Sequence, residues 1–551
     1  MKRMRSVVSK ANKRLSIKIA AILLAASTLI SSLMGLFRDR LLNSAYLPNE
    51  EAGLAGYPVG LDAYTAAFTV PDFMYFILVS GALSVTFIPV FNERLAKGNK
   101  KSAWQISTSM INFMALITLI ASILIIVFAD PIIRYIIAPG LSESGHGLAV
   151  SMMRVIAVNP FLFAIATVIA SIQQAVGRFT FYALAPIIYN IGIIIGITWF
   201  TNGIVLFGWE IFEGGIMGVA LGVVLGAILQ LLVSSIGLIG LGLDYRFKIY
   251  WKNKGFRKVL SLLPPRSLDQ GMDYAVTLVE INLASRMADG TIRAYQQALT
   301  LHMVPINLIG VAISSAAFPS MTESLGKGRL DLFRNELRKM LRIIIWLALP
   351  VAVITFFTRG YLIHFIRNGG DVQMAGILGF LVPAIFFRSV YHITSRAFYA
   401  QQDTKTPLYI SIAAIALNIV LAIFLSMQLD MGAYGLAIAQ SIVAGIEVFI
   451  LFIIINSRLK KLFDLTFMKA VARMVISAAV MGVGTYALVL LLPLQNTDNS
   501  FFSAFPKFLV ITAVSFLLYV GVSQLFKLQE AKPIIERIYK LLFSSLNGSR
   551  H

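Results

Sequence analysis

The sequence predicts an all-α polytopic membrane protein with about fourteen transmembrane helices. Of its 551 residues, 58% are hydrophobic and only 13% are charged. Long apolar runs alternate with short polar breaks, and a bilayer core of about 30 Å needs roughly 20 helical residues per crossing. A soluble chain of this length would carry more charge on its outer helix faces. The absence of cysteine excludes disulfides, thiolate metal sites and cysteine nucleophiles.

The individual spans are predicted from apolar runs in windows of about 19 residues. They cover 16–38, 62–91, 104–129, 148–175, 180–201, 214–241, 261–286, 292–320, 340–358, 372–397, 407–428, 432–456, 468–494 and 501–526. The first run follows a basic N-terminus. It is too long for the core of a signal peptide, and no A-x-A-like cleavage site follows promptly, which favours a retained first span.

Lysine and arginine gather in one set of loops and are scarce in the alternate set. The basic set comprises the N-terminus and the loops near 94–101, 246–258, 327–339 and 458–461. In contrast, 201–215 and 495–500 contain no basic residue. Because positive loops stay in the cytoplasm, we expect a multi-pass protein of the cell membrane with both termini cytoplasmic. This topology also explains most of the net charge of +21, so nucleic acid is not an expected partner.

Two pairs of segments repeat along the chain. TFIPVFNERLAKGN at 86–99 and AAFPSMTESLGKGR at 316–329 share proline, glutamate, leucine, lysine and glycine at one constant offset. A weaker similarity relates GGIMGVALG at 214–222 to MGAYGLAIA at 431–439. The repeats predict two six-helix halves in the same orientation, a transporter plan with a site between the halves.

The repeats and the charge pattern give the predicted domain organisation. A basic cytoplasmic N-terminus at 1–15 precedes an N-lobe at 16–245 with helices 1 to 6. A basic cytoplasmic linker at 246–260 leads to a C-lobe at 261–461 with helices 7 to 12. Two extra helices at 462–527 and a cytoplasmic tail at 528–551 complete the chain.

Ionisable residues inside the spans are candidates for function, because each costs at least about 2.5–3.5 kcal/mol near the bilayer centre. The seventh helix places Arg266, Asp269, Asp273 and Glu280 on one face. This face lines a water-filled cavity, or it is structural, with Arg266 paired to Asp269 and the acids paired to arginines of neighbouring helices; the two readings can coexist. Further polar positions within spans are Arg154, Arg388, His392 and Arg396.

Several kinds of site have no motif in this sequence. There is no G-x-x-x-x-G-K-[ST] phosphate loop, so ATP-driven pumping by this chain is not expected. H-E-x-x-H, G-x-S-x-G and a metal-spaced histidine cluster are also missing. We therefore expect a transporter with no cofactor and no metal, not an enzyme. Membrane-embedded catalysis is the alternative, with the helix-seven acids as its candidates.

Several segments resemble a known family of transporters. GLFRDRLL at 35–42, the long segment at 61–91 and FYAQQDTKTPLYI at 398–410 are similar to the MurJ-type lipid II flippases of the MATE-like multidrug/oligosaccharidyl-lipid/polysaccharide exporter superfamily. Further similar segments are APG at 138–140, QQAVGRFTFYALAPIIYN at 173–190 and GVAISSAAFPSM at 310–321. The resemblance implies two lobes in a V around a central cationic cavity. It also implies flipping of undecaprenyl-pyrophosphate-linked peptidoglycan precursor to the outer leaflet by alternating access.

The resemblance also implies a binding site. Arg38 and Asp39 match the family's Arg-Asp pair at the end of helix one, where the arginine engages the diphosphate. Asp62 matches the acid that opens helix two and is a plausible partner for Arg38. Arginine suits a diphosphate because its planar fork of donors cannot deprotonate. The alternative is that Arg38 and Asp39 only anchor the helix end at the membrane interface.

The sequence departs from the family pattern at several cations. Tyr75 and Phe76 replace paired arginines of helix two, Ser80 replaces a glutamate, and Ser32 and Thr300 replace arginines of helices one and eight. Candidates that could supply these charges from other helices are Arg266, Arg286, Arg293 and Arg388. Otherwise the substrate differs, and another polyprenyl-linked oligosaccharide or cation-coupled multidrug export is the alternative function. Expected partners are the lipid-linked cell-wall precursor, membrane lipids and the cell-wall synthesis machinery; the oligomeric state stays open.

Overall fold

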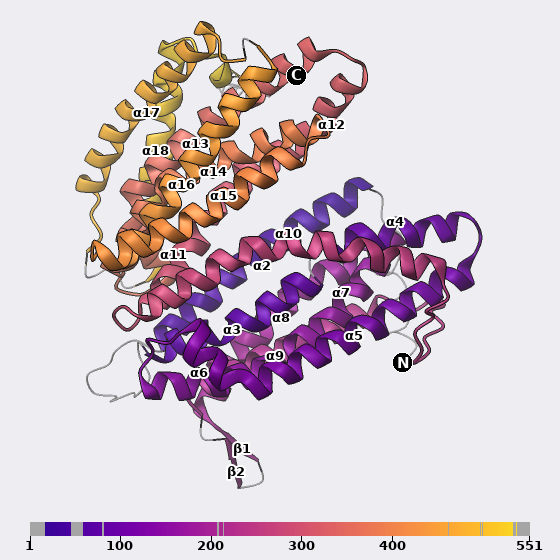
Figure 1. Ribbon diagram of the computed structural model, residues 1–551. Helices are drawn as coiled ribbons and strands as arrows, with labels where there is room; N and C mark the ends of the chain where they lie inside the picture. The colour runs from indigo at the N-terminus through magenta and orange to yellow at the C-terminus, as the bar shows by residue number, and fades with distance from the viewer. Residues whose placement is uncertain are drawn as a thin grey trace, which may run out of the picture. The chain divides into compact units, whose positions relative to one another are not determined.

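A computed structural model describes the chain over 17–45, 59–79, 82–206, 209–212, 214–460, 462–495, 498, 500–532 and 536. Nearly all of these residues are helical. The chain divides into two compact units, unit 1 from Met1 to Arg293 and unit 2 from Ala294 to His551 (Figure 1). The all-α membrane class predicted from the sequence is confirmed.

Unit 1 is a helical bundle with one small hairpin. Its elements are α2 (Ile17–Ala45), α3 (Val59–Leu78), α4 (Ala82–Ala96), α5 (Lys100–Pro131), η1 (Ile132–Ile137), α6 (Glu143–Ile156), α7 (Asn159–Ala175), α8 (Thr180–Thr198), η2 (Phe200–Asn202), β1 (Ile204–Leu206), β2 (Trp209–Phe212), α9 (Met217–Ile236) and α10 (Lys254–Ser285). Strands β1 and β2 pair antiparallel, with Ile204 opposite Phe212. The hairpin lies in the loop predicted between the fifth and sixth spans.

Unit 2 continues the helical pattern from α11 onward; α11 itself begins in the last residues of unit 1. Its elements are α11 (Thr291–Pro305), η3 (Ile306–Val311), α12 (Ala312–Gly326), α13 (Leu330–Ile366), α14 (Val372–Ala400), α15 (Lys405–Ile423), η4 (Phe424–Gln428), α16 (Gly432–Arg458), α17 (Leu465–Leu491), α18 (Phe501–Leu525) and η5 (Gln529–Ala531). The two C-terminal helices α17 and α18 pack on α13 and on each other.

Eleven helical segments in the described part of the chain are long and apolar enough to cross a membrane. All fourteen predicted ranges fall on a helix or on consecutive helices. The ranges 16–38, 62–91 and 261–286 are helical but are not among the eleven segments. The exact number of fourteen spans therefore stays a prediction.

The repeated segments 86–99 and 316–329 have the same local structure. In each, the shared glutamate and lysine form an ion pair at the end of a helix, with N–O distances of 2.8 and 2.5 Å. A glycine in the left-handed region follows, with φ of 73° at Gly98 and 68° at Gly328. Glycine ends a helix in this conformation without steric cost, and the next helix begins two residues later.

The weaker repeat also has a structural counterpart. A Cβ atom at Gly218, near the start of α9, would lie 2.5 Å from the carbonyl carbon of Phe200. At the corresponding Gly435, near the start of α16, it would lie 2.7 Å from the carbonyl carbon of Leu425. In both halves a helix thus starts directly against the backbone of a short helical segment that precedes it in the chain, η2 or η4, and a larger residue would not fit.

The two compact units divide the chain at a different place from the predicted linker at 246–260. Helix α10, which begins at Lys254 within that predicted linker, packs against α3, α4 and α5 and belongs to unit 1. The lobe boundaries at 16–245 and 261–461 remain predictions from the repeats.

Glycines let two helices of unit 1 approach closely. A Cβ atom at Gly192 of α8 would lie 2.2 Å from the Cα atom of Gly226 in α9, and one at Gly196 would lie 2.6 Å from that of Gly222. Such glycine pairs, four residues apart on each helix, allow dense packing of membrane helices, where lipid removes most of the hydrophobic driving force.

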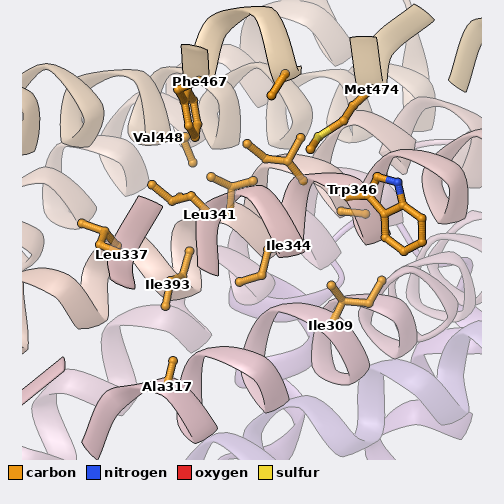
Figure 2. Close-up of a cluster of buried hydrophobic side chains, with 14 of the residues drawn as sticks. Ile309, Ala317, Leu337, Leu341, Ile344, Trp346, Ile393, Val448, Phe467 and Met474 are labelled. Carbon is orange, nitrogen blue, oxygen red and sulfur yellow. The ribbon is translucent and has the colours of Figure 1, made fainter. Parts of the chain in front are cut away.

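Large apolar side chains from several helices form the core of unit 2 (Figure 2). The labelled members are Ile309, Ala317, Leu337, Leu341, Ile344, Trp346, Ile393, Val448, Phe467 and Met474. Trp346 is buried and satisfies its indole N–H with a 3.1 Å hydrogen bond to the Ser523 hydroxyl. This contact ties α18 to α13 through the core.

Candidate functional site

Arg38 lies near the end of α2 in unit 1 and is held by two partners. Its Nη2 and Nε donate to Oδ1 of Asp39 at 3.0 and 3.3 Å. Its Nη1 donates to the side-chain oxygen of Asn190 on α8 at 3.2 Å. The Asn190 amide in turn donates to the carbonyl of Pro186 at 3.1 Å and to Ser31. The guanidinium is therefore fixed from two sides.

Arg293, at the start of α11, joins the same carboxylate. Its Nη2 donates to Oδ1 of Asp39 at 3.4 Å and lies 3.5 Å from the side-chain oxygen of Asn43. The guanidinium carbon lies 6.0 Å from the ring centroid of Tyr64 on α3. Only 11% of the Arg293 side chain is exposed, against 24% for Arg38. Two arginines thus share the single carboxylate of Asp39.

Asp62 supports this cluster through the backbone. Its Oδ2 accepts from the Gly290 N–H at 2.7 Å, and its Oδ1 accepts from the Arg293 N–H at 2.8 Å. The carboxylate is 2% exposed and binds the N-terminus of α11, where free N–H groups favour a negative charge. The expected pairing with the Arg38 side chain is not what the structure shows; Asp62 instead positions the residue that carries the second guanidinium.

The arrangement suits an anionic ligand. Asp39 is shared by the two guanidinium groups, and the hydrogen bonds of Asp62 go to the backbone N–H groups at the start of α11. Arg293 also keeps a buried Nε that has no hydrogen-bond partner among the described residues. Guanidinium forks with spare donors bind phosphate oxygens in a fixed geometry.

The helix-seven candidates are only partly described. Arg266, Asp269 and Asp273 lie on α10, but their side chains fall outside the described part of the structure. Glu280, farther along the same helix, is 1% exposed and so does not face lipid. Arg286 follows α10 and donates from Nε to the Asn282 side-chain oxygen at 3.2 Å. The proposed charged face of this helix stays a prediction.

Arg388 lies in unit 2, in a polar network of its own. Its Nη1 donates to Oε2 of Glu447 on α16 at 2.8 Å, and the Ser411 hydroxyl of α15 donates to Oε1 at 2.8 Å. The Tyr391 hydroxyl lies 3.0 Å from the Ser411 hydroxyl. The Glu447 side chain is 1% exposed, whereas that of Arg388 is 33% exposed. The network thus buries the acid and leaves part of the guanidinium accessible.

The FYAQQDTKTP segment forms the turn between α14 and α15. Both carboxylate oxygens of Asp403 are used: Oδ2 accepts from the Thr406 hydroxyl at 2.6 Å and pairs with Arg458 at 2.8 Å, while Oδ1 accepts from the Lys405 and Thr406 N–H groups. Hydrogen bonds from Thr406, with help from Arg458, lower the pKa of Asp403 to about 2. The segment that carries much of the family resemblance is therefore a structural turn.

Comparison with known proteins decides the family. The model of the family described as lipid II flippase MurJ matches residues 52–505. The chain belongs to the MurJ family. The family consists of transporters, so the chain is a multi-pass membrane transport protein and not an enzyme.

Curated relatives support this assignment over nearly the whole chain. The probable lipid II flippase MurJ of Thermotoga maritima is 26% identical over 522 residues, which cover 93% of this chain and 97% of the relative. The corresponding protein of Buchnera aphidicola subsp. Schizaphis graminum is 27% identical over 515 residues, with 90% and 93% covered.

Solved structures agree on the fold. A lipid II flippase MurJ in an inward closed conformation superposes with a TM-score of 0.73 at 25% identity, covering 92% of this chain and 98% of that one. An inward-facing multidrug transporter of the MATE family has a TM-score of 0.64 at 16% identity, covering 80% and 98%. The chain therefore shares its fold with this MATE family transporter.

Aromatic contacts occupy the positions where the MurJ resemblance expects paired arginines. The Tyr75 hydroxyl lies 3.1 Å from the Thr167 hydroxyl on α7. The ring of Phe76 lies 5.3 Å from that of Tyr274 on α10, measured between centroids. This part of unit 1 thus has packed rings in place of two charges. Thr300 donates its hydroxyl to the Gln296 carbonyl of its own helix at 2.9 Å and adds no charge either.

Sequence reasoning missed two residues of these clusters. Asn190 orients Arg38 and is the last residue of the segment 173–190 that resembles the family. Its contact with Arg38 could not be predicted without the folded structure. Glu447 is the acid in the apolar run 432–456, and a lone carboxylate in a predicted span was the signal that could have found it.

Proposed function

We propose that this chain is a lipid II flippase that moves undecaprenyl-pyrophosphate-linked peptidoglycan precursor from the inner to the outer leaflet. Arg38 and Arg293 bind the diphosphate in this proposal. The observation that carries it is the sharing of Asp39 by both arginines, in a chain that belongs to the MurJ family.

The two guanidinium groups match the chemistry of the proposed substrate. A lipid-linked pyrophosphate carries roughly two negative charges, and each guanidinium presents a planar fork of donors to its oxygens. Asp39 holds both forks in place without substrate, which lowers the entropic cost of binding. Asp62 fixes the backbone of Arg293 and so the position of its fork.

Transport is proposed to follow alternating access without ATP hydrolysis by this chain. The repeated halves and the missing phosphate loop support this mechanism. The basic loops support cytoplasmic termini. Arg266 and Arg388 are proposed as additional cations along the substrate path, and the cell-wall synthesis machinery as the partner that supplies and consumes the precursor.

Reconstituted vesicles test the binding site. Purified Arg38→Ala, Arg38→Lys and Arg293→Ala proteins are compared with wild type for flipping of lipid II. Loss of one charge-assisted contact in a water-poor site costs roughly 1.5–3 kcal/mol, or about 10- to 150-fold in affinity. Lysine should rescue only partly, since it keeps the charge and loses the fork.

Arg134→Ala is the matched control, because this exposed arginine of unit 1 pairs with Glu143 away from the cluster. It should flip at the wild-type rate. If Arg38→Ala also flips lipid II normally, Arg38 is only an interfacial anchor. If wild-type protein ignores lipid II and moves a different polyprenyl-linked oligosaccharide or a cationic drug, the proposed substrate is wrong.

A further inference from the structure

Unit 2 carries an apolar groove between α13, α14 and α16, with a volume of about 790 Å³. Its walls include Phe356, Phe380, Phe387, Ile442, Ile446 and Phe449. All three helices are long and apolar enough to cross a membrane. Three of its apolar side chains, Phe380, Ile446 and Phe449, are 43%, 39% and 65% exposed, as suits a surface in contact with hydrocarbon.

Two small residues give the groove its depth. Gly379 of α14 and Gly445 of α16 both line it. A Cβ atom at Gly445 would lie 3.3 Å from the ring of Phe387, so a side chain there would fill the groove. Ser441, also in the lining, donates its hydroxyl to the Phe380 carbonyl at 2.6 Å. With this hydroxyl satisfied, the surface fits a hydrocarbon chain.

Arg359 lies at the Gly379 end of the groove. Its guanidinium carbon is 4.5 Å from the ring centroid of Phe356, and its Nη1 donates to the Phe356 carbonyl at 2.5 Å. Its Cδ would be 3.2 Å from a Cβ at Gly379. Within the described residues Arg359 forms no ion pair, and Asp371, at the start of α14, pairs with Arg367. The fork therefore keeps donors for an anion.

Arg359 lies close enough to the end of α13 for its long side chain to reach the level of the lipid phosphates. It lies seven residues before the end of α13 at Ile366, or about 10 Å along the helix. The head-group layer is about 5–7 Å thick on each side of the hydrocarbon core. If the turn after α13 lies at the membrane surface, Arg359 is near the boundary of hydrocarbon and head groups. Tyr434, whose ring lies 5.5 Å from that of Phe380, is a typical aromatic residue of this boundary.

The length of the groove matches one leaflet. On α16 it runs from Ile438 to Phe449, eleven residues or about 16 Å. Half of a bilayer core is about 15 Å thick. One extended acyl chain that starts at Arg359 would therefore end near the membrane midplane.

We propose that this groove binds one acyl chain of an anionic phospholipid whose phosphate is held by Arg359. An arginine at this depth without a carboxylate is costly unless an anion neutralises it. A lipid phosphate matches its donor fork, and the apolar groove accommodates the chain below. This site lies wholly in unit 2 and does not depend on the transport substrate.

Native mass spectrometry of the purified full-length chain tests the site. Phosphatidylglycerol and phosphatidylcholine with identical chains are titrated onto wild type, Arg359→Gln, Arg359→Lys and Ile446→Trp. Wild type should bind phosphatidylglycerol more strongly than phosphatidylcholine. Arg359→Gln should lose roughly tenfold in affinity for phosphatidylglycerol, as expected for one charge-assisted contact, and Arg359→Lys should lose less. Ile446→Trp should weaken binding of both lipids because the indole fills the groove.

Two substitutions on α17 serve as matched controls. Arg473→Gln removes an arginine that donates to the Phe526 carbonyl, and Ile476→Trp adds an indole at an exposed position outside the groove. Both should bind lipid like wild type. Equal phosphatidylglycerol binding by Arg359→Gln and Arg473→Gln overturns the phosphate site, and equal binding by the two tryptophan variants overturns the groove. Displacement of phosphatidylglycerol by a polyprenyl phosphate at equal concentration would show that the occupant is a different lipid. If Arg359→Gln does not fold, the comparison of Ile446→Trp with Ile476→Trp tests lipid binding in the groove.

Discussion

The carboxylate of Asp62 accepts a 2.8 Å hydrogen bond from the backbone N–H of Arg293, whose side chain reaches Asp39 at 3.4 Å. The same carboxylate accepts from the N–H of Gly290 at 2.7 Å. One acid of α3 thereby sets where α11 begins, and α11 delivers a guanidinium to the acid of α2. The position of Arg293 thus depends on a carboxylate that binds its backbone.

Asp62→Ala should therefore lower both stability and transport. The change leaves two N–H groups in a buried turn without their acceptors, at roughly 1–3 kcal/mol for each group. Asp62→Asn keeps one acceptor oxygen and should lose less. Thermal unfolding in detergent and lipid II flipping in vesicles measure the two effects. Normal unfolding and normal flipping by Asp62→Ala would refute the positioning role.

Asn190→Leu should slow flipping without removing a charge. The amide oxygen of Asn190 accepts from Arg38 Nη1 at 3.2 Å, so its loss frees the guanidinium to leave its bound orientation. The effect should be smaller than that of Arg38→Ala. In the double variant the two losses should not add, because both act through one guanidinium. Asn202→Leu is the control, since the Asn202 amide donates to the Thr198 carbonyl away from the cluster. Additive losses would show that Asn190 acts independently of Arg38.

The fold was predictable from hydropathy because the solvent is lipid. Windows of apolar residues located the helices of the described part of the chain, but they could not find local breaks. The predicted span 62–91 is two helices, α3 and α4, and the span 148–175 is divided between α6 and α7 just before the Asn159–Pro160 step. A window average is insensitive to such breaks, and the hairpin at 204–212 was likewise too short to register.

The site was predictable only in part. Resemblance to the family pointed to Arg38, Asp39 and Asp62, and position on the chain suggested Arg293. Their connections were not predictable, because Asn190 and the N-terminus of α11 come close only in the folded chain. The partner of Asp62 could not be predicted from its residue type. Its carboxylate was expected to pair with an arginine side chain, and in the structure it accepts from backbone N–H groups.

Gly222→Leu should destabilise unit 1 strongly. A Cβ atom at this position would lie 2.4 Å from the Cα atom of Gly196, so α8 and α9 would have to separate. Gly222→Ala should already lower the unfolding temperature, and leucine should lower it further or prevent folding. Gly147→Leu is the control, because a Cβ atom there meets nothing within 4 Å. Equal unfolding temperatures for Gly222→Ala and wild type would contradict the close packing.

Asp403 should make the stability of the α14–α15 turn depend on pH. Its pKa is lowered to about 2 from an ordinary value of 3.8, so folding favours the ionised form. The stabilisation is complete above about pH 4 and is lost as the pH falls through about 2. Asp403→Asn should unfold at a lower temperature than wild type at pH 7, and the difference should shrink towards pH 3. Asp244→Asn, in an exposed loop, should match wild type at both values. A difference that does not change with pH would contradict the ionised contact.

Arg388 and Glu447 should prove strongly coupled in unfolding measurements. Arg388→Met leaves a carboxylate that is 1% exposed without its cation, a loss of about 3–5 kcal/mol for a buried pair. Glu447→Gln should cost less, because 33% of the Arg388 side chain is exposed, whereas the carboxylate is buried. The double variant Arg388→Met with Glu447→Gln should regain most of the stability, since the neutral amide needs no counter-ion and can still accept from the Ser411 hydroxyl. A double-mutant cycle on thermal unfolding in detergent measures the coupling directly. If the two single losses simply add, the pair does not stabilise unit 2, and Arg388 is held by other contacts.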